Sequence, residues 1–211
     1  MSRIISLGEQ SFQALIQENY FYIDKTKFIK DWWLGGDRVT LITRPRRFGK
    51  TLMLDTVKTF FSPKFAGRYD LFEGLEIWKD EKFRQLQGTI PVIFLYLAKI
   101  KNVNYVQTIE NIKDSLTTIY KRFKANLNLS LLSDDDQELF TSVHKSMSDV
   151  TAQNALLNLS EFIERYLKNK PIILINEYAT PLQEAWLKTS GMISVISCVF
   201  FSMLHLRVIH I

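Results

Sequence analysis

The strongest constraint on the fold is a succession of three segments around residue 50. Residues 38–43 are apolar and β-branched and follow the pair Gly35-Gly36, which predicts a short buried strand. An arginine-rich loop, residues 44–51, comes next. The following segment has one apolar helical face, made of Met53, Val57, Phe60 and Phe61. Because Pro63 ends that helix, the sequence predicts a strand, a loop and a helix in direct order.

The remainder of the chain repeats the alternation of strands and helices. Residues 92–97 lack polar alternation, as expected for a strand covered on both faces in a parallel sheet, and residues 171–175 are predicted to form the next strand. Two helical stripes lie between them, one made of Ile109, Ile112, Leu116, Ile119, Tyr120 and Phe123, and one of Leu156, Leu159, Ile163 and Tyr166. Residues 133–136 suit a helix start. This order predicts an α/β fold with ligands beyond the carboxyl ends of the strands.

Gly49, Lys50 and Thr51 have the composition of a phosphate-binding loop. Such a loop directs backbone N–H groups and a lysine at a polyphosphate, and its hydroxyl binds Mg²⁺. The full pattern places a glycine five residues before Gly49, where this chain has Arg44. The flanking strand and helix supply the required context, so we expect ATP and Mg²⁺ to bind here. The residues expected to bind the nucleotide are Arg46, Arg47, Phe48, Gly49, Lys50, Thr51 and Leu52.

The basic side chains of this loop allow more than one interpretation. Arg44, Arg46 and Arg47 could add charge to phosphate contacts. They could equally form a solvated basic loop or a contact with nucleic acid. The net charge of +5 and the isoelectric point near 9.2 favour anionic partners, but only weakly for a chain of 211 residues.

A second polar site follows the strand at residues 171–175. In P-loop ATPases an apolar strand ends in an aspartate that orders Mg²⁺, and the next residue is a glutamate that polarises the attacking water. Here these positions are Asn176 and Glu177. We therefore expect Thr51 and Asn176 at the metal and Glu177 as the catalytic residue. Asn176 is neutral and cannot supply the charge of an aspartate.

Four blocks together resemble the AAA-ATPase-like proteins of bacteria, many of which carry a nuclease-like domain of the PD-(D/E)XK type further along. The blocks are residues 22–26, 43–51, 71–75 and 174–186. The resemblance implies an ASCE/AAA-like P-loop NTPase, with a three-layer α/β core around a mainly parallel sheet. It also explains Arg44, because the loop of this family has arginine and proline where other P-loops begin with glycine.

The family's second motif reads isoleucine, aspartate, glutamate, tyrosine, aspartate, threonine and proline, and this chain departs from it. Asn176 and Ala179 replace the two aspartates. Removing one group that stabilises transition-state charge costs about 2.7–4 kcal/mol in other enzymes. The sequence therefore predicts a degenerate ATPase that binds nucleotide and hydrolyses it weakly or not at all. The alternative is slow turnover with Glu177 intact.

The resemblance stops after Leu187. When codons for residues 191–211 are chosen freely and read one nucleotide earlier, they can encode the family's continuation, which predicts a frameshift between Lys188 and Ser190. Residues 1–190 would then be the amino-terminal part of the P-loop domain, and residues 191–211 an aberrant tail. The sheet would be incomplete, with an apolar edge prone to self-association. The alternative is a divergent helix packed on the sheet.

Two other functional interpretations stay open. One is a basic module that binds nucleic acid without catalysis, and the other is a truncated remnant without a cellular role. A single cysteine, Cys198, excludes an intramolecular disulfide and favours a cytoplasmic location. The amino terminus lacks the features of a secretory signal, and the most apolar stretch falls short of the ~20 residues needed to span a bilayer. We therefore predict no membrane association.

Overall fold

The computed structural model describes residues 4–43, 45, 47–97, 105–125, 132–176 and 207–210. Its centre is a sheet of four parallel strands: β1 (Val39–Leu41), β2 (Val92–Tyr96), β3 (Ile172–Asn176) and β4 (Arg207–His210). The strand order is β1-β4-β3-β2, so β4 separates the strand before the arginine-rich loop from the strand that ends in Asn176.

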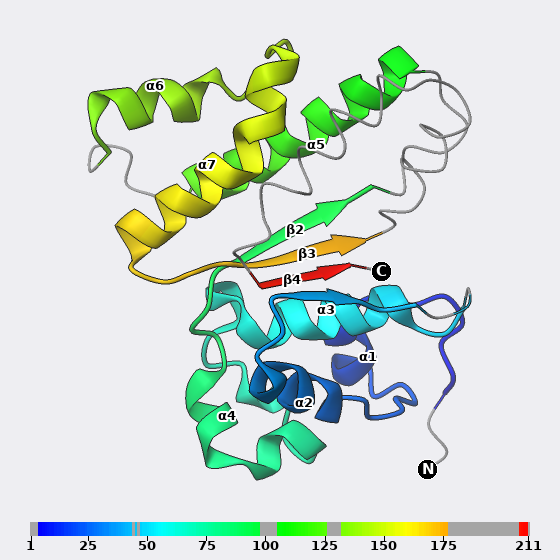
Figure 1. Cartoon of the computed structure of the whole chain (residues 1–211). Helices are drawn as coiled ribbons and strands as arrows, with labels where there is room; N and C mark the ends of the chain where they lie inside the picture. Colours follow the sequence, from blue (N-terminus) through cyan, green and yellow to red (C-terminus); the bar gives the residue numbers. More distant parts are fainter. Residues whose placement is uncertain are drawn as a thin grey trace.

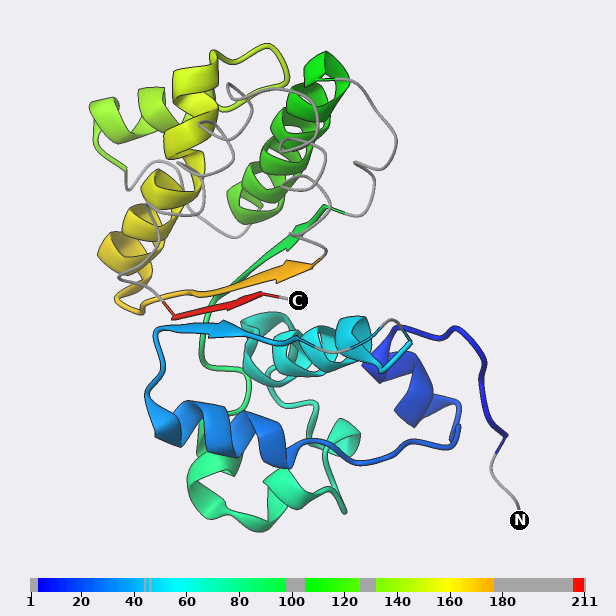
Figure 2. The ribbon, with the colours of Figure 1, turned by 45° about the vertical axis from the view of Figure 1, so that its right-hand side comes forward.

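Helices cover both faces of this sheet, which gives three layers (Figure 1). One face carries α1 (Phe12–Gln17), α2 (Lys27–Gly35), α3 (Lys50–Phe61) and α4 (Glu81–Leu86), with the short 3-10 helices η1 (Pro63–Phe65), η2 (Tyr69–Leu71) and η3 (Glu76–Lys79). The opposite face carries α5 (Tyr105–Lys124), α6 (Asp134–Ser142) and α7 (Asp149–Leu167). Figure 2 shows the same separation after a 45° turn. The predicted α/β class, with a P-loop-like parallel core, is confirmed.

β3 is the most deeply buried strand, and all five of its residues are buried. Ile172 and Leu174 pack in the core shared with α1–α4, whereas Ile173 and Ile175 pack in the core shared with α5–α7. This division follows from the period of two residues in a strand. The strand predicted at residues 171–175 is therefore confirmed, and it is covered on both faces.

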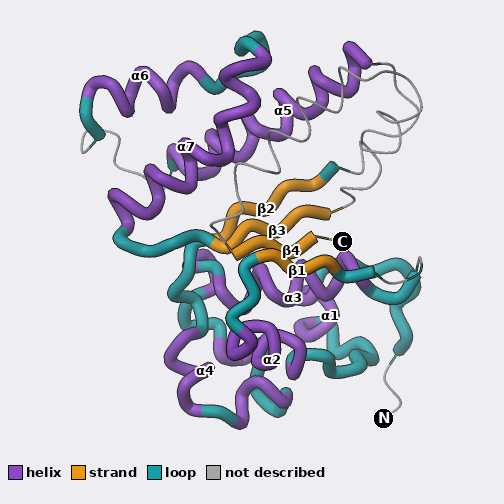
Figure 3. The backbone as a smooth tube through the Cα atoms, in the orientation of Figure 1, coloured by secondary structure: helices purple, strands orange, loops and turns teal. Residues whose placement is uncertain are grey.

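Figure 3 shows the helices in purple, and local sequence determines where two of them, α6 and α7, begin. The Ser133 side chain accepts a hydrogen bond from the N–H of Asp136 and starts α6, as predicted for residues 133–136. The Ser148 side chain accepts from the N–H of Thr151 and starts α7 in the same way. The predicted apolar stripes of α5 and α7 are confirmed, because all but Phe123 and Tyr166 are buried and these two pack partly buried against the same core.

α3 also matches its prediction, with one difference in the buried face. The helix begins at Lys50 and ends at Phe61, two residues before Pro63. Leu54 is fully buried, whereas Met53, assigned to the apolar stripe, is only half-buried. Leu54 lies seven residues before Phe61 and thus on the same face of the helix, so the core side of α3 is rotated by one residue from the predicted side.

The prediction that the strand before the loop is buried was wrong. In β1, Val39 is 43% exposed and Leu41 is 51% exposed. β1 lies at one end of the strand order and pairs only with β4 among the described strands. The prediction for residues 92–97 was partly wrong for a similar reason, since β2 lies at the other end and Tyr96 is 40% exposed. Apolar strands at the ends of a sheet therefore keep exposed side chains here.

The carboxyl-terminal segment contributes a strand to the middle of the sheet. In β4, Val208 and Ile209 are buried, and the N–H of Val208 donates to the carbonyl of Arg38 at 2.7 Å. The alternative prediction of a terminal helix does not hold for residues 207–210. The other residues assigned to an aberrant tail, 191–206 and 211, lie outside the described part, and the frameshift stays a prediction. Among the described helices, none combines the length and apolarity needed to cross a bilayer.

Candidate phosphate-binding site

The loop before α3 turns through two left-handed residues. Gly49, which directly precedes α3, has φ 74° and ψ 24°, and Arg47 has φ 68°. Glycine adopts this region without strain, whereas an arginine there is uncommon and indicates that the surrounding loop imposes it. Left-handed residues of this kind form concave arrangements of backbone N–H groups that bind anions.

The first turn of α3 leaves its backbone donors available. The first helical hydrogen bond runs from the N–H of Met53 to the carbonyl of Gly49, at 2.9 Å. The N–H groups of Lys50, Thr51 and Leu52 precede it, and the residue before the helix provides no side-chain cap. The first turn also contains no acidic residue to offset the positive end of the helix dipole. Such a terminus is suited to an anion.

The structure brings the two predicted polar sites together. Thr51 lies in the first turn of α3, Asn176 is the last residue of β3, and Thr51 Oγ1 lies 3.5 Å from Asn176 Oδ1. This proximity follows from the parallel sheet, because β3 ends at the edge where α3 begins. The chain therefore places the hydroxyl expected at a metal beside the residue that replaces the metal-ordering aspartate.

Asn176 fits this position poorly. The residue is 1% exposed, and its Nδ2 donor has no hydrogen-bond partner among the described residues. A buried unpaired donor costs about 1–3 kcal/mol. An aspartate here would accept from the Thr51 hydroxyl and would place no donor in this surrounding. An oxygen acceptor would therefore leave no unpaired donor at this position.

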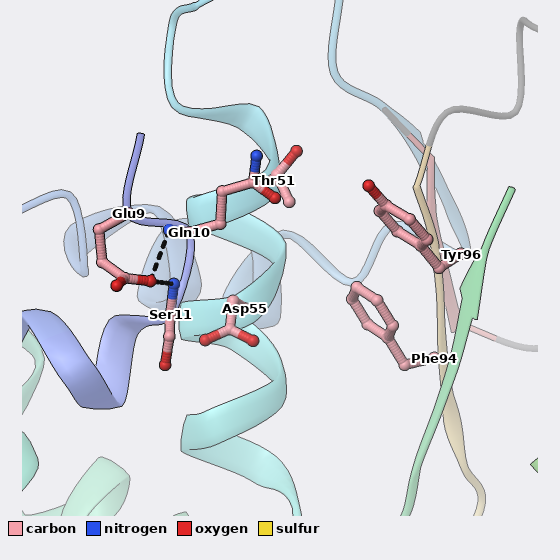
Figure 4. A pocket seen from close by; sticks show the side chains of 7 residues that line it. All are labelled: Glu9, Gln10, Ser11, Thr51, Asp55, Phe94 and Tyr96. Atoms are coloured by element: carbon pink, nitrogen blue, oxygen red, sulfur yellow. Dashed lines mark hydrogen bonds between the residues drawn. The ribbon is translucent and has the colours of Figure 1, made fainter. Parts of the chain in front are cut away.

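A pocket of about 340 Å³ opens beside Thr51. Figure 4 shows Thr51 and Asp55 of α3 facing Phe94 and Tyr96 of β2, with Glu9 on a third side. Both carboxylates already have protein partners. Glu9 accepts from the N–H groups of the next two residues, and Asp55 accepts from a backbone N–H of α1 at 2.8 Å while pairing with a lysine of α3. Neither one replaces the missing aspartate.

The donor set suits Mg²⁺ only when it arrives with phosphates. Among the described residues, no group of three or more histidine, cysteine or acidic side chains could hold a metal. Mg²⁺ is commonly bound through substrate phosphates, waters and one or two protein oxygens. The Thr51 hydroxyl would supply one such oxygen, and the neutral Asn176 would supply the only other side-chain oxygen that the prediction placed at the metal.

The remaining predicted site residues have different positions. Arg44, Arg46 and Glu177 lie outside the described residues. Phe48 is 59% exposed, and Leu52 packs partly buried against the core. Within the described part of the chain, no carboxylate lies within 4.0 Å of the charged groups of Arg47 or Lys50. Among the described residues, no ion pair therefore offsets the positive charge of Arg47 and Lys50.

Sequence reasoning missed one residue at this loop. Lys25 Nζ donates to the carbonyl of Phe48 at 3.5 Å, and a β-carbon placed on Gly49 would lie 3.7 Å from it. The only sequence signal was the block at residues 22–26, to which no role was assigned. A contact across 23 positions depends on the tertiary fold and has no local pattern.

A model of a known protein family, described as "AAA-ATPase_like: Predicted AAA-ATPase", matches residues 6–206. This chain belongs to the AAA-ATPase-like family. The match confirms the resemblance that the four sequence blocks indicated. The match also extends into residues 191–206, which the sequence analysis assigned to an aberrant tail. The boundary between domain and tail at residue 190 stays a prediction.

Comparisons with individual proteins and solved structures show less similarity to this AAA-ATPase-like chain. A protein of Azotobacter chroococcum mcd 1, described as "Uncharacterized protein in vnfD 5'region", is 39% identical over 74 residues. The aligned segment is 35% of this chain and 13% of that protein, so the chain spans a small part of the relative's length. No solved structure matches.

Proposed function

We propose that this AAA-ATPase-like chain binds ATP with Mg²⁺ at the start of α3 and hydrolyses it slowly or not at all. The observation that carries the proposal is the uncapped first turn of α3, whose N–H groups follow a left-handed glycine and lie beside the end of β3. Family membership supports a nucleotide as the ligand.

Each residue has a distinct role in this proposal. Lys50 and the backbone donors from Gly49 to Leu52 bind the β- and γ-phosphates. Arg46, Arg47 and Phe48 complete the loop around the polyphosphate. Thr51 supplies the hydroxyl for Mg²⁺, Asn176 faces the metal's water shell, and Glu177 polarises the attacking water.

Weak hydrolysis follows from the charge at Asn176. A neutral amide stabilises the charge developing in phosphoryl transfer less than a carboxylate that orders the metal does. Most donors that bind the phosphates belong to the backbone, and the replacement of one side chain at the end of β3 leaves them in place. Binding is therefore retained while turnover is reduced.

The direct test is titration of the purified chain with a fluorescent ATP analogue and Mg²⁺. Lys50→Ala removes charge-assisted contacts worth roughly 1.5–3 kcal/mol each, so we expect a loss of affinity of about 100-fold. Lys121→Ala, an exposed change on α5, is the control and should match wild type. Unchanged affinity of Lys50→Ala would overturn the proposal.

Titration at raised salt separates nucleotide binding from the alternative of a basic nucleic-acid module. Phosphate-driven binding of nucleic acid falls steeply with salt and requires neither Mg²⁺ nor nucleotide. We expect ATP binding to persist in salt that abolishes any binding of a DNA or RNA oligonucleotide. The reverse result would favour the nucleic-acid module.

Three further predictions belong with this proposal. The exposed apolar residues of β1 at the end of the sheet favour self-association through that edge. A cytoplasmic location is expected from the single cysteine, Cys198.

The frameshift between Lys188 and Ser190, with its consequence of a truncated remnant, is tested by the coding DNA. Restoring the frame there should extend the family-like sequence.

A further inference from the structure

The segment that carries Lys25 is anchored on both sides of this residue. Asp24 Oδ1 accepts from the N–H and hydroxyl of Thr26 at 2.8 and 2.7 Å, and Asp24 Oδ2 accepts from the N–H of Glu76 at 2.7 Å. The Thr26 hydroxyl accepts from the N–H of Ile77 at 3.1 Å, and Thr26 is fully buried. The neighbours of Lys25 are thus fixed to the start of η3, while Lys25 itself is exposed.

The ammonium group of Lys25 lies beside the loop before α3. Lys25 Nζ lies 3.5 Å from the carbonyl oxygen of Phe48 and close to the open side of Gly49. Gly49 directly precedes the uncapped first turn of α3. The ammonium group therefore lies beside the backbone donors proposed to bind phosphate.

Lys25 differs from the next two lysines of the same segment in its charge environment. Lys27 pairs with Asp31 at 3.1 Å, and Lys30 pairs with Asp80 at 3.5 Å. For Lys25, none of the described carboxylates lies within 4.0 Å. Both oxygens of the adjacent Asp24 accept hydrogen bonds from other groups. Within the described part of the chain, Lys25 is thus a cation without an ion pair beside the loop.

We propose that Lys25 is a second ammonium group of the phosphate site, acting with Lys50 on the polyphosphate of the bound nucleotide. This inference rests on the proposed function. Without ligand, Lys25 donates to the Phe48 carbonyl, and with nucleotide it donates to a phosphate oxygen. The exchange is favourable because a phosphate oxygen carries negative charge that attracts the ammonium group, whereas the Phe48 carbonyl is neutral. The site then discriminates among nucleotides by the number of their phosphates.

The test compares fluorescent analogues of ATP, ADP and AMP on the whole chain. Lys25→Gln should weaken binding of the ATP analogue by about tenfold or more, that of ADP less, and that of AMP little. Lys25→Arg keeps the charge and should recover most of the affinity. Lys27→Gln is the matched control, because it removes an exposed lysine two residues away, and it should behave as wild type.

Thermal unfolding without nucleotide separates ligand binding from support of the loop. We expect Lys25→Gln to leave the unfolding midpoint unchanged, because the side chain is exposed. A lowered midpoint with equal weakening of all three analogues would mean that Lys25 only supports the loop, and would overturn the inference. Unaltered affinity would also overturn it. If Lys50→Ala weakens binding and Lys25→Gln does not, this inference alone fails, whereas absence of binding to wild type defeats the proposed function as well.

Discussion

The amino end of α3 and the carboxyl end of β3 meet at one edge of the sheet and differ in what they offer a ligand. The α3 end presents backbone N–H groups, a left-handed glycine, and Lys25 and Lys50, which form no ion pair with any described residue. The β3 end presents a neutral amide whose buried donor has no partner among the described residues. An anion site built mostly from backbone tolerates side-chain replacement, whereas metal ordering depends on one carboxylate. The proposed function therefore predicts that nucleotide binding and turnover can be separated by mutation.

The largest expected effect comes from restoring the missing charge at the β3 end. In Asn176→Asp, the carboxylate accepts from the Thr51 hydroxyl and can order the metal's water shell. We expect ATP hydrolysis to rise by about two to three decades, as judged from single electrostatic groups in other enzymes. Release of inorganic phosphate under saturating ATP and Mg²⁺ measures this change.

Asn154→Asp is the control for that experiment, because it makes the same substitution on an exposed position of α7. It should leave hydrolysis at the wild-type level. If Asn176→Asp binds the ATP analogue as wild type does yet gains no hydrolysis, charge at the β3 end is not what limits turnover.

Substitution of Gly49 tests whether the backbone at the amino end of α3 binds the nucleotide. Gly49→Ala adds a β-carbon to a residue with φ 74°, next to Lys25 Nζ. We expect about tenfold weaker nucleotide binding and a loss of about 1–2 kcal/mol in stability from the left-handed backbone. Titration and thermal unfolding measure the two effects.

Gly67→Ala is matched to it, since Gly67 has φ 77° and open space around the added carbon. It should lose similar stability and keep full affinity. Equal losses of affinity in both variants would mean that Gly49 acts through general stability and not through the loop.

A hydrogen-bonded cluster of side chains between α6 and α7 offers a substitution that should lower the stability of the fold without changing nucleotide affinity. The Asp136 side chain accepts from the Tyr166 hydroxyl at 2.6 Å and from Arg165, and these bonds lower the pKa of Asp136. Because the residue is 6% exposed, Asp136→Asn should cost about 2 kcal/mol, or about 4–8 °C in the unfolding midpoint, with unchanged ATP affinity.

The same substitution has a defined pH dependence. A carboxyl group with a lowered pKa stabilises the fold above its unfolded pKa of about 3.9 and loses that contribution as pH falls through the folded value. The difference between Asp136→Asn and wild type should therefore be full at neutral pH and shrink below about pH 4. The exposed neighbour Asp135, changed to Asn, serves as the control and should differ little from wild type. A pH-independent difference would contradict the charge-based explanation.

The smallest expected effect concerns the free end of the sheet at β1. Leu41→Lys places a charge on an edge strand and should reduce concentration-dependent association, while leaving nucleotide binding intact. Sedimentation velocity over a range of concentrations measures it. Val106→Lys, at an exposed apolar position on α5, should not change association. If both variants associate as wild type does, the β1 edge is not the contact.

Sequence could predict those parts of the fold that local patterns determine. The apolar stripe of α5, the Ser133 cap of α6 and the end of α3 before Pro63 all follow from spacing or capping within a few residues. The proximity of Thr51 to Asn176 at the end of β3 could be predicted from the phosphate-loop motif, because the carboxyl ends of parallel strands share one edge of the sheet. These features depend on short stretches of sequence or on a general rule of parallel sheets.

The features that sequence missed depend on the order of strands and on distant contacts. The exposure of Leu41 reflects the place of β1 at the end of the sheet, which no property of residues 38–43 encodes. The pairing of β4 with β1 and β3 joins segments far apart in the chain. Lys25 reaches the loop only because η3 anchors the residues on either side of it.

Amide hydrogen exchange at residues 47–52 tests most directly whether the backbone before and within the first turn of α3 binds a polyphosphate. Uncapped N–H groups at a helix start exchange readily, and a bound phosphate would protect them. We expect ATP with Mg²⁺ to slow exchange at these residues, and adenosine, which has no phosphate, to leave it unchanged. Unaltered exchange at residues 47–52 under saturating ATP, or equal slowing by adenosine, would contradict the account.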